Sequence, residues 1–283
     1  MSLHPRVVVC LDVKDGRVVK GTRFEGLRDV GDPVELAARY EAEGADEIVY
    51  LDISASKEGR GTLLELVRRT AEVLFVPLTV GGGVRTAADI GPLLRAGADK
   101  ISVNTAAVRD PAILSEGAYR FGSQCIVISV DAARDPAGAA EGTGGPTRSG
   151  WRAYTHGGSQ PTGLDAVEWA AEAVERGAGE VLLTSIDRDG VRGGYDVALT
   201  RAIADRVGVP VVASGGAGEA AHLRDAFVEG HASAALVAGI LHDGLTTVGA
   251  LKSALAGWGI DVRRTDPAGA ATPSRGAGLG GLR

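Results

Sequence analysis

Residues 76–83 read VPLTVGGG and residues 209–216 read VPVVASGG, an apolar run closed by glycines that returns 133 residues later. A second pair of segments keeps the same separation, with GADEIVYLDI at residues 44–53 and GAGEVLLTSI at residues 177–186. Repetition at a fixed separation indicates a chain built from similar structural units. We therefore expect two halves that hold like elements in like order.

Working outward from these repeats, short apolar runs rich in β-branched residues recur along the chain, as is typical of buried parallel strands. Segments with helical patterning separate them, and the first opens with Asp32-Pro33, a capping residue followed by a favoured first helical residue. Strand followed by helix, eight times, predicts an α/β protein that folds as a (β/α)8 TIM barrel of two similar half-barrels, with a doubly wound open sheet as the alternative. The expected strands are 6–11, 48–52, 76–80, 100–103, 126–130, 181–184, 209–213 and 234–238, and the expected helices are 32–43, 62–74, 86–96, 110–121, 165–176, 197–207, 219–228 and 246–255.

Two segments lie outside this pattern. Residues 134–163 are rich in glycine, alanine, proline, serine and threonine, and they predict a long inserted loop after the fifth strand. Residues 265–283 show little periodicity and predict a disordered tail. The barrel domain is therefore expected to span residues 1–264.

The composition narrows the class of protein. With 45% hydrophobic and 23% charged residues, the 283-residue chain is not a largely disordered protein. No apolar run reaches the roughly 18 residues that a membrane helix needs, and the net charge of −6 argues against nucleic-acid binding. The strand expected from residue 6 leaves no room for a signal peptide. Cys10 and Cys125 lie in separate apolar runs, so we expect two buried free thiols in a cytoplasmic protein.

Glycine-rich turns follow equivalent strands of the two halves. The reactive face of a TIM barrel is formed by the loops after the strands. Residues 81–83 and 214–216 follow one pair of equivalent strands there, and residues 104–105 and 238–239 follow the next pair. Glycine lets backbone N–H groups approach an anion closely, and a following helix N-terminus favours negative charge. The duplication predicts a substrate with a phosphate at each end; the alternative is that these glycines serve tight packing alone.

Two aspartates end the first strand of each half. Asp12 closes the run VVVCLD and Asp131 closes IVISVD. Two carboxyl groups at a barrel mouth divide general-acid and general-base work when their environments separate their protonation states. Alternatively, each carboxylate caps a loop or pairs with a cation such as Lys20. The DRDG stretch at residues 187–190 has two interpretations, a cation-binding loop and a turn or helix cap. No further ligand cluster accompanies it, so we expect no metal and no other cofactor.

Four charged residues stand where expected strands begin, at the end of the barrel opposite the reactive face. They are Arg6, Glu47, Lys100 and Glu180. One interpretation is a layer of salt bridges that closes the bottom of the barrel. The other interpretation is that the four residues form a gate at this end of the barrel.

Seven motifs are spread over the chain: CLDVKDGRVVKG (10–21), DVGDP (29–33), TVGGG (79–83), GADKISVNTA (97–106), FGSQ (121–124), LTSIDRDG (183–190) and ASGGAG (213–218). Together they resemble the cyclase-subunit family of imidazole glycerol phosphate synthase, over about residues 4–264. The resemblance implies a TIM barrel that needs no cofactor and forms a heterodimer with a glutaminase subunit. It implies that ammonia from this partner reacts with the bisphosphorylated phosphoribulosyl-formimino form of aminoimidazole carboxamide ribonucleotide, PRFAR. The products would be imidazole glycerol phosphate and aminoimidazole carboxamide ribonucleotide, in histidine biosynthesis.

The resemblance also implies residue roles. It makes Asp12 the general acid and Asp131 the general base. It implies substrate or phosphate binding by Lys20, Gly83, Asn104, Thr105, Asp189, Gly190, Gly216, Ala238 and Gly239. It implies an ammonia gate of Arg6, Glu47, Lys100 and Glu180, and a partner interface that includes Asp99 and Gln124.

The chain departs from the family pattern at some positions, and two other functions stay open. The fifth loop is longer here, Gly157 stands where the family often has serine, and Ala232 stands where it often has an acidic residue. The nearest rival is the sister isomerase of the same pathway, which uses no ammonia; Lys20 and the four charged residues favour the cyclase. A non-catalytic scaffold is the other alternative, and the intact aspartate pair with both glycine-rich turns argues against it.

Overall fold

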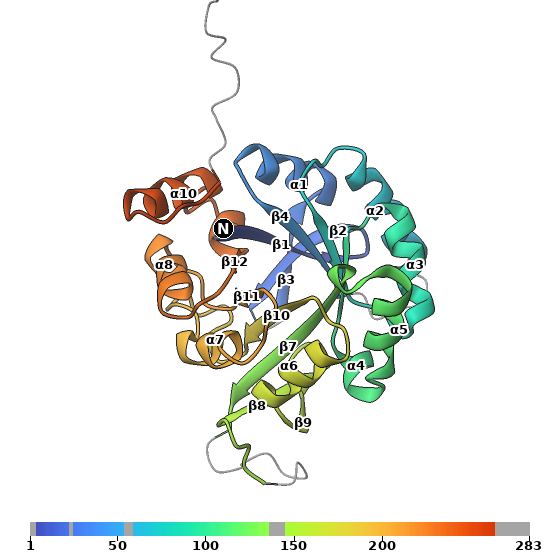
Figure 1. Cartoon of the computed structure of the whole chain (residues 1–283). Coiled ribbons are helices and arrows are strands. Elements are labelled where there is room, and N and C mark those ends of the chain that lie inside the picture. The colour runs from blue at the N-terminus through green and yellow to red at the C-terminus, as the bar shows by residue number, and fades with distance from the viewer. Residues whose placement is uncertain (1–3, 23–24, 54–58, 136–144, 264–283) are drawn as a thin grey trace, which may run out of the picture.

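The computed structural model describes residues 4–22, 25–53, 59–135 and 145–263, so the tail expected at 265–283 and residues 136–144 of the expected loop lie outside it. Within the described residues, eight strands pair in parallel around a closed ring, and helices surround them (Figure 1). This closure confirms the predicted (β/α)8 barrel, since an open sheet would leave two edges unpaired. In ring order the strands are β1 (Arg6–Lys14), β4 (Glu47–Asp52), β5 (Leu78–Gly81), β6 (Lys100–Val103), β7 (Ile126–Arg134), β10 (Glu180–Ser185), β11 (Val211–Ser214) and β12 (Ala234–Val237).

The main helices lie close to their predicted positions. The side chain of Asp32 accepts hydrogen bonds from the backbone N–H groups of Val34 and Glu35, which explains why the Asp-Pro pair begins the first helix. Two strands begin two residues later than predicted, after Pro77 and Pro210, because proline has no N–H to donate to the sheet. The helices are α1 (Pro33–Ala42), α2 (Gly59–Ala71), α3 (Ala87–Ala96), α5 (Ala112–Phe121), α6 (Ala166–Glu175), α7 (Val197–Ala204), α8 (Ala220–Val228) and α10 (Val248–Gly257).

The two halves repeat more than the main strands and helices. The first connection of one half carries the antiparallel strands β2 (Arg17–Thr22) and β3 (Glu25–Gly31), and that of the other carries β8 (Trp151–Thr155) and β9 (Gln160–Asp165). Each half also has a short helix after its last strand, α4 (Thr105–Arg109) in one and α9 (Gly239–His242) in the other. The symmetry inferred from sequence therefore extends into the loops of the reactive face.

The described part of the segment predicted as a long inserted loop contains a β-hairpin, formed by β8 and β9. β8 pairs antiparallel with β7, and both β8 and β9 lie at the lower edge of the view in Figure 1. Arg152 is 1% exposed, and its guanidinium donates to the Asp135 carboxylate at 2.6 Å. The hairpin is held to the barrel by its pairing with β7, by the buried apolar side chains of Trp151 and Ala153, and by this ion pair, whereas the glycine-rich composition around it is typical of a loop.

The interior of the barrel is layered. Alternate residues of each strand point inward, and a cluster of buried side chains fills the middle of the barrel. The charged residues at the strand starts lie below this cluster, and the two aspartates at the strand ends lie above it. The cluster consists of Val8, Cys10, Val49, Val127, Leu182, Val212, Ala234 and Leu236.

Both cysteines are free, but only one is buried as predicted. Cys10 is 4% exposed inside the barrel, whereas Cys125 lies half-buried in the single turn of helix (Ser123–Cys125) that precedes β7. The apolar run that follows Cys125 made it resemble a core residue. Among the described residues, no helix is long and apolar enough to cross a bilayer.

Candidate active site

Asp12 and Asp131 occupy equivalent positions in the two halves, near the carboxyl ends of β1 and β7. Asp12 pairs with Leu51 across the sheet, and Asp131 with Thr184. Burial raises the pKa of each carboxyl group from an ordinary value of 3.8 to about 7. Each group therefore populates both its acid and its base form near neutral pH, as general acid–base catalysis requires.

The surroundings of the two carboxyl groups differ. The Asn104 amide donates a hydrogen bond to Asp131 Oδ2 at 2.9 Å, and this bond partly offsets the effect of burial on the pKa of Asp131. The Cys10 Sγ lies 4.0 Å from Asp12 Oδ1. A fixed amide donor favours a carboxylate, so the site gives Asp131 the environment of a base. Asn104 was predicted to bind substrate or phosphate, and in the structure its side chain reaches this aspartate.

A third carboxyl group, that of Asp189, belongs to the same cluster. Its charge contributes to the raised pKa of both Asp12 and Asp131. Burial also raises the pKa of Asp189 itself, and the backbone N–H of Gly190 partly compensates by donating to it. Asp189 was predicted to bind substrate or phosphate. The structure brings it close to the aspartate pair, where one more negative charge favours protonated carboxyl groups. Among the described residues, no group of three or more histidine, cysteine or acidic side chains is arranged to hold a metal ion.

The two predicted anion sites have matching backbones. Asn104 precedes α4 with φ −130° and ψ −87°, and Ala238 precedes α9 with φ −136° and ψ −75°. Thr105 and Gly239 are the first residues of these short helices. Two turns with the same unusual geometry, one in each half, present N–H groups at the ends of equivalent strands.

Gly83 and Gly216 lie in the glycine-rich loops after equivalent strands of the two halves. Gly83 and Gly216 both adopt left-handed backbone angles, with φ of +66° and +108°. A Cβ on Gly216 would lie 2.2 Å from the carbonyl oxygen of Gly194, so no side chain fits there. Gly190, with φ of +74°, takes the same region in the loop after β10. These conformations support the packing interpretation of the glycines as well as the anion-binding one.

Lys20 reaches the Gly239 end of the site rather than the aspartate pair. Its ammonium donates to the carbonyl oxygen of Gly239 at 3.1 Å and pairs with the carboxylate of Asp243. Arg28 and Arg192 pair with the same carboxylate. The alternative in which Lys20 neutralises Asp12 is therefore wrong. Arg28, Arg192 and Asp243 were not predicted to belong to the site, because nothing along the chain indicates that they meet.

The opposite end carries a different group. The hydroxyl of Thr105 accepts the backbone N–H of His156 at 3.0 Å, which ties the β8–β9 turn to the start of α4. Arg109 Nη2 lies 2.9 Å from His156 Nε2. His156 was also missed, and its only signal was the Gly157-Gly158 pair that follows it in a segment interpreted as a loop.

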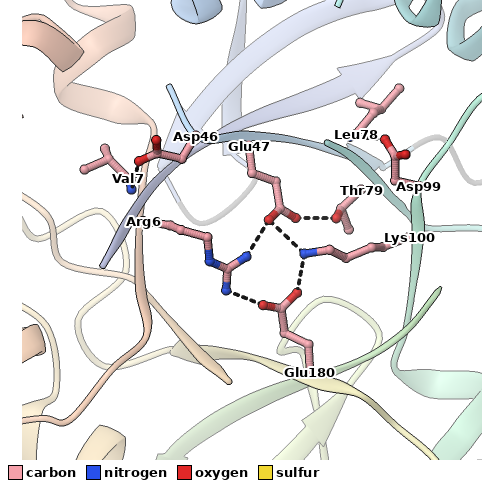
Figure 2. Close-up of polar contacts among 9 residues, drawn as sticks. All are labelled: Arg6, Val7, Asp46, Glu47, Leu78, Thr79, Asp99, Lys100 and Glu180. Carbon is pink, nitrogen blue, oxygen red and sulfur yellow. Dashed lines mark hydrogen bonds and ion pairs between the residues drawn. The ribbon is translucent and has the colours of Figure 1, made fainter. Parts of the chain in front are cut away.

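The four charged residues at the strand starts form a closed ring of ion pairs (Figure 2). Glu47 Oε2 accepts from Arg6 at 2.7 Å and from Lys100 at 2.8 Å. Glu180 accepts from the same two cations, at 2.7 Å from Lys100. Glu47 and Glu180 are 2% and 5% exposed, so this ring crosses the lower mouth of the barrel and joins strands from both halves.

The two residues predicted for a partner interface lie at this same end. Asp99 is exposed and directly precedes β6, and its carboxylate accepts the backbone N–H of Leu78 at 2.8 Å. Gln124 is exposed in the turn before β7. Phe75, in the connection from α2 to β5, is 92% exposed and was missed by sequence analysis. A large exposed aromatic residue is typical of a binding surface.

Comparison with known proteins gives consistent matches over nearly the whole chain. A family model described as "Histidine biosynthesis protein" matches residues 6–247. A relative from Myxococcus xanthus is 68% identical over 263 residues, covering 92% of this chain and 98% of its own length. Relatives from Mycobacterium tuberculosis and Caulobacter vibrioides are 58% and 55% identical, covering 93% and 95% of this chain and 96% and 100% of their own lengths. All three are named imidazole glycerol phosphate synthase subunit HisF.

Proposed function

Because this chain belongs to the histidine biosynthesis protein family and is a cyclase subunit of imidazole glycerol phosphate synthase, a lyase, we propose that its site converts PRFAR and ammonia into imidazole glycerol phosphate and aminoimidazole carboxamide ribonucleotide. The observation that carries this proposal is the pair Asp12 and Asp131, each with a pKa of about 7 at the reactive end of the barrel. The two matching turns at Asn104 and Ala238, one on either half, support a substrate with two phosphates.

The chemistry needs one acid and one base. Ammonia adds to the ribulosyl carbonyl, and the departing oxygen leaves as water once it has been protonated. The nitrogen then loses a proton as it closes onto the formimino carbon and expels the carboxamide ribonucleotide. We assign the acid to Asp12 and the base to Asp131, because the Asn104 amide favours the carboxylate form of Asp131. With pKa values of about 7, both forms are available near neutral pH.

The charged ring and the aspartates lie at opposite ends of the barrel interior. A molecule entering at the ring would pass the apolar cluster around Val8 and Cys10 before it reaches Asp12. Ammonia in its neutral form is small enough and sufficiently weakly hydrated for such a route, whereas ammonium is not. We therefore propose that a glutaminase subunit docks on the face with Asp99, Gln124 and Phe75 and delivers ammonia through the ring. A cytoplasmic location fits this biosynthetic role and the two free thiols.

The gate is tested by replacing one member of the ring. Lys100→Ala should change the ratio of glutamine-dependent to ammonia-dependent turnover in the complex with the glutaminase. Arg17→Ala, which removes an exposed ion pair with Asp29 at the opposite end of the barrel, is the matched control and should leave that ratio unchanged. A Lys100→Ala protein that loses only thermal stability would return the ring to a structural role.

The overall activity is tested with the isolated subunit. It should consume PRFAR in the presence of an ammonium salt at alkaline pH, with loss of the substrate's absorbance, and leave the aminoaldose precursor unchanged. Isomerisation of that precursor without ammonia would identify the sister isomerase instead. A protein that binds PRFAR and the glutaminase without turnover would be a scaffold.

A further inference from the structure

The carboxylate of Asp243 gathers three cations from three separate segments. Lys20 comes from β2, Arg28 from β3, and Arg192 from the loop after β10, and each forms an ion pair with Asp243 at the end of α9. Lys20 and Asp243 are about one-fifth exposed, whereas the side chains of Arg192 and Arg28 are 41% and 57% exposed. The centre of the group is therefore partly enclosed, where charge interactions are less screened than on an open surface, and the two arginines reach it from the solvent side.

The group carries more positive than negative charge. Hydrogen bonding from Lys20 lowers the pKa of Asp243, so this carboxyl group is ionised at neutral pH. Three cations then meet one carboxylate, and two positive charges are left over within these four side chains. A phosphate monoester carries about −1.5 to −2 charges at neutral pH and offers three strong acceptor oxygens. Its charge matches the surplus.

The cations also lie where a phosphate is expected. A Cβ placed on Gly239 would be 3.3 Å from Lys20 Nζ and 3.9 Å from Arg192 Nη2, so both cations stand directly beside this residue. Gly239 belongs to one of the two matching turns, and its lack of a side chain leaves room between the backbone and the cations.

Arg192 is held in place by its own loop. Its backbone lies in the left-handed region at φ +61°, which non-glycine residues adopt only when the surroundings enforce it. A Cβ on Gly218 would lie 2.2 Å from the carbonyl oxygen of Arg192, so the loops after β10 and β11 are packed in contact here. Strain of this kind concentrates at binding sites, where it fixes a side chain in advance.

The geometry points to Arg28 and Arg192 as phosphate-binding residues that act with Lys20 at the Gly239 end of the site. This assignment rests on the proposed function and names the residues that hold one end of its substrate. The other end has Arg109 and His156 beside Thr105 instead. The two ends are therefore chemically different, and the two monophosphate products should each depend on a different group.

The test measures the two ends separately. Arg28→Gln and Arg192→Gln are compared with Arg17→Gln as the control. Arg17 lies in the same hairpin as Arg28, but its guanidinium pairs with Asp29 at 2.9 Å instead of with Asp243. In ammonia-dependent assays the first two variants should raise the KM for PRFAR at least tenfold and change kcat less than threefold. Calorimetric titration with each product should show weakened binding of only one of them. Arg17→Gln should match the wild type in both measurements.

Two results would overturn the assignment while leaving the proposed function intact. One is a KM for PRFAR within twofold of wild type in both Arg28→Gln and Arg192→Gln. The other is an equal loss of affinity for both products, which would indicate that the arginines attract anions through long-range electrostatics rather than by contact with one phosphate. A wild-type protein that does not consume PRFAR would instead refute the proposed function, and the calorimetric comparison would still report on the binding group.

Discussion

Replacing Asp12 with asparagine should make the protein more stable while it sharply lowers turnover, and the gain in stability should depend on pH. Burial raises the pKa of Asp12 from 3.8 to about 7, so the folded state resists ionisation that the unfolded chain accepts. The stability contributed by the protonated group is fully present below pH 3.8 and is lost as the pH rises through 7. One pKa unit corresponds to about 1.4 kcal/mol, so the complete loss amounts to about 4 kcal/mol.

The measurable quantity is the part of this loss that falls between pH 5 and pH 8. With pKa values of 3.8 unfolded and about 7 folded, it is roughly 2.5 kcal/mol. Asparagine keeps the size of the side chain and does not titrate, so Asp12→Asn avoids this loss. The stability difference between variant and wild type should therefore grow by about 2.5 kcal/mol from pH 5 to pH 8. Effects of the new amide that do not depend on pH cancel in this comparison.

Urea unfolding at both pH values, followed by circular dichroism, supplies the free energies. Asp29→Asn is the matched control, because it makes the same change at an exposed position in the β2–β3 hairpin. Ammonia-dependent turnover of Asp12→Asn should fall at least 10²-fold, while PRFAR still binds in a titration without ammonia. A stability difference that stays constant between pH 5 and pH 8 would refute the reasoning about burial. Near-wild-type turnover would refute the assignment of Asp12 as the acid.

Three further predictions follow from neighbouring contacts. Asn104→Ala removes the hydrogen-bond donor to Asp131, so the pKa of Asp131 should rise above about 7 and the corresponding limb of the pH–rate profile should move to higher pH. An unshifted limb would show that Asn104 does not act on the pKa of the general base. Gly216→Ala places a Cβ 2.2 Å from a carbonyl oxygen at a backbone φ of +108°, so it should lower the free energy of unfolding in urea by about 1–3 kcal/mol. Gly208→Ala, whose Cβ would have no neighbouring atom within 4 Å, should leave it unchanged. Burial lowers the pKa of His242 to about 4, so nitrogen NMR should show a neutral imidazole down to about pH 5. The neutral group should contribute stability that is lost as the pH falls from 6.5 through 4. An imidazolium signal at pH 6 would contradict this prediction.

The sequence alone determined the barrel and the location of its candidate catalytic groups along the chain. Repeats 133 residues apart specified two similar halves, and alternating strand and helix patterns specified their order. These are local or periodic properties, which can be seen along a chain without knowing its contacts. The position of Asp12 and Asp131 at strand ends followed from the same patterns, because all parallel strands of a barrel end at one face.

Only the tertiary structure decided which side chains meet. Lys20 pairs with Asp243, 223 positions away, and Arg6 pairs with Glu180, 174 positions away. The β8–β9 hairpin buries Arg152 against Asp135, a contact that a composition typical of a loop concealed. The raised pKa values of the aspartates likewise depend on the side chains that bury them, and those come from many strands at once. Spacing along the chain carries no information about these contacts, because each is created by barrel closure, which brings distant segments to the same face.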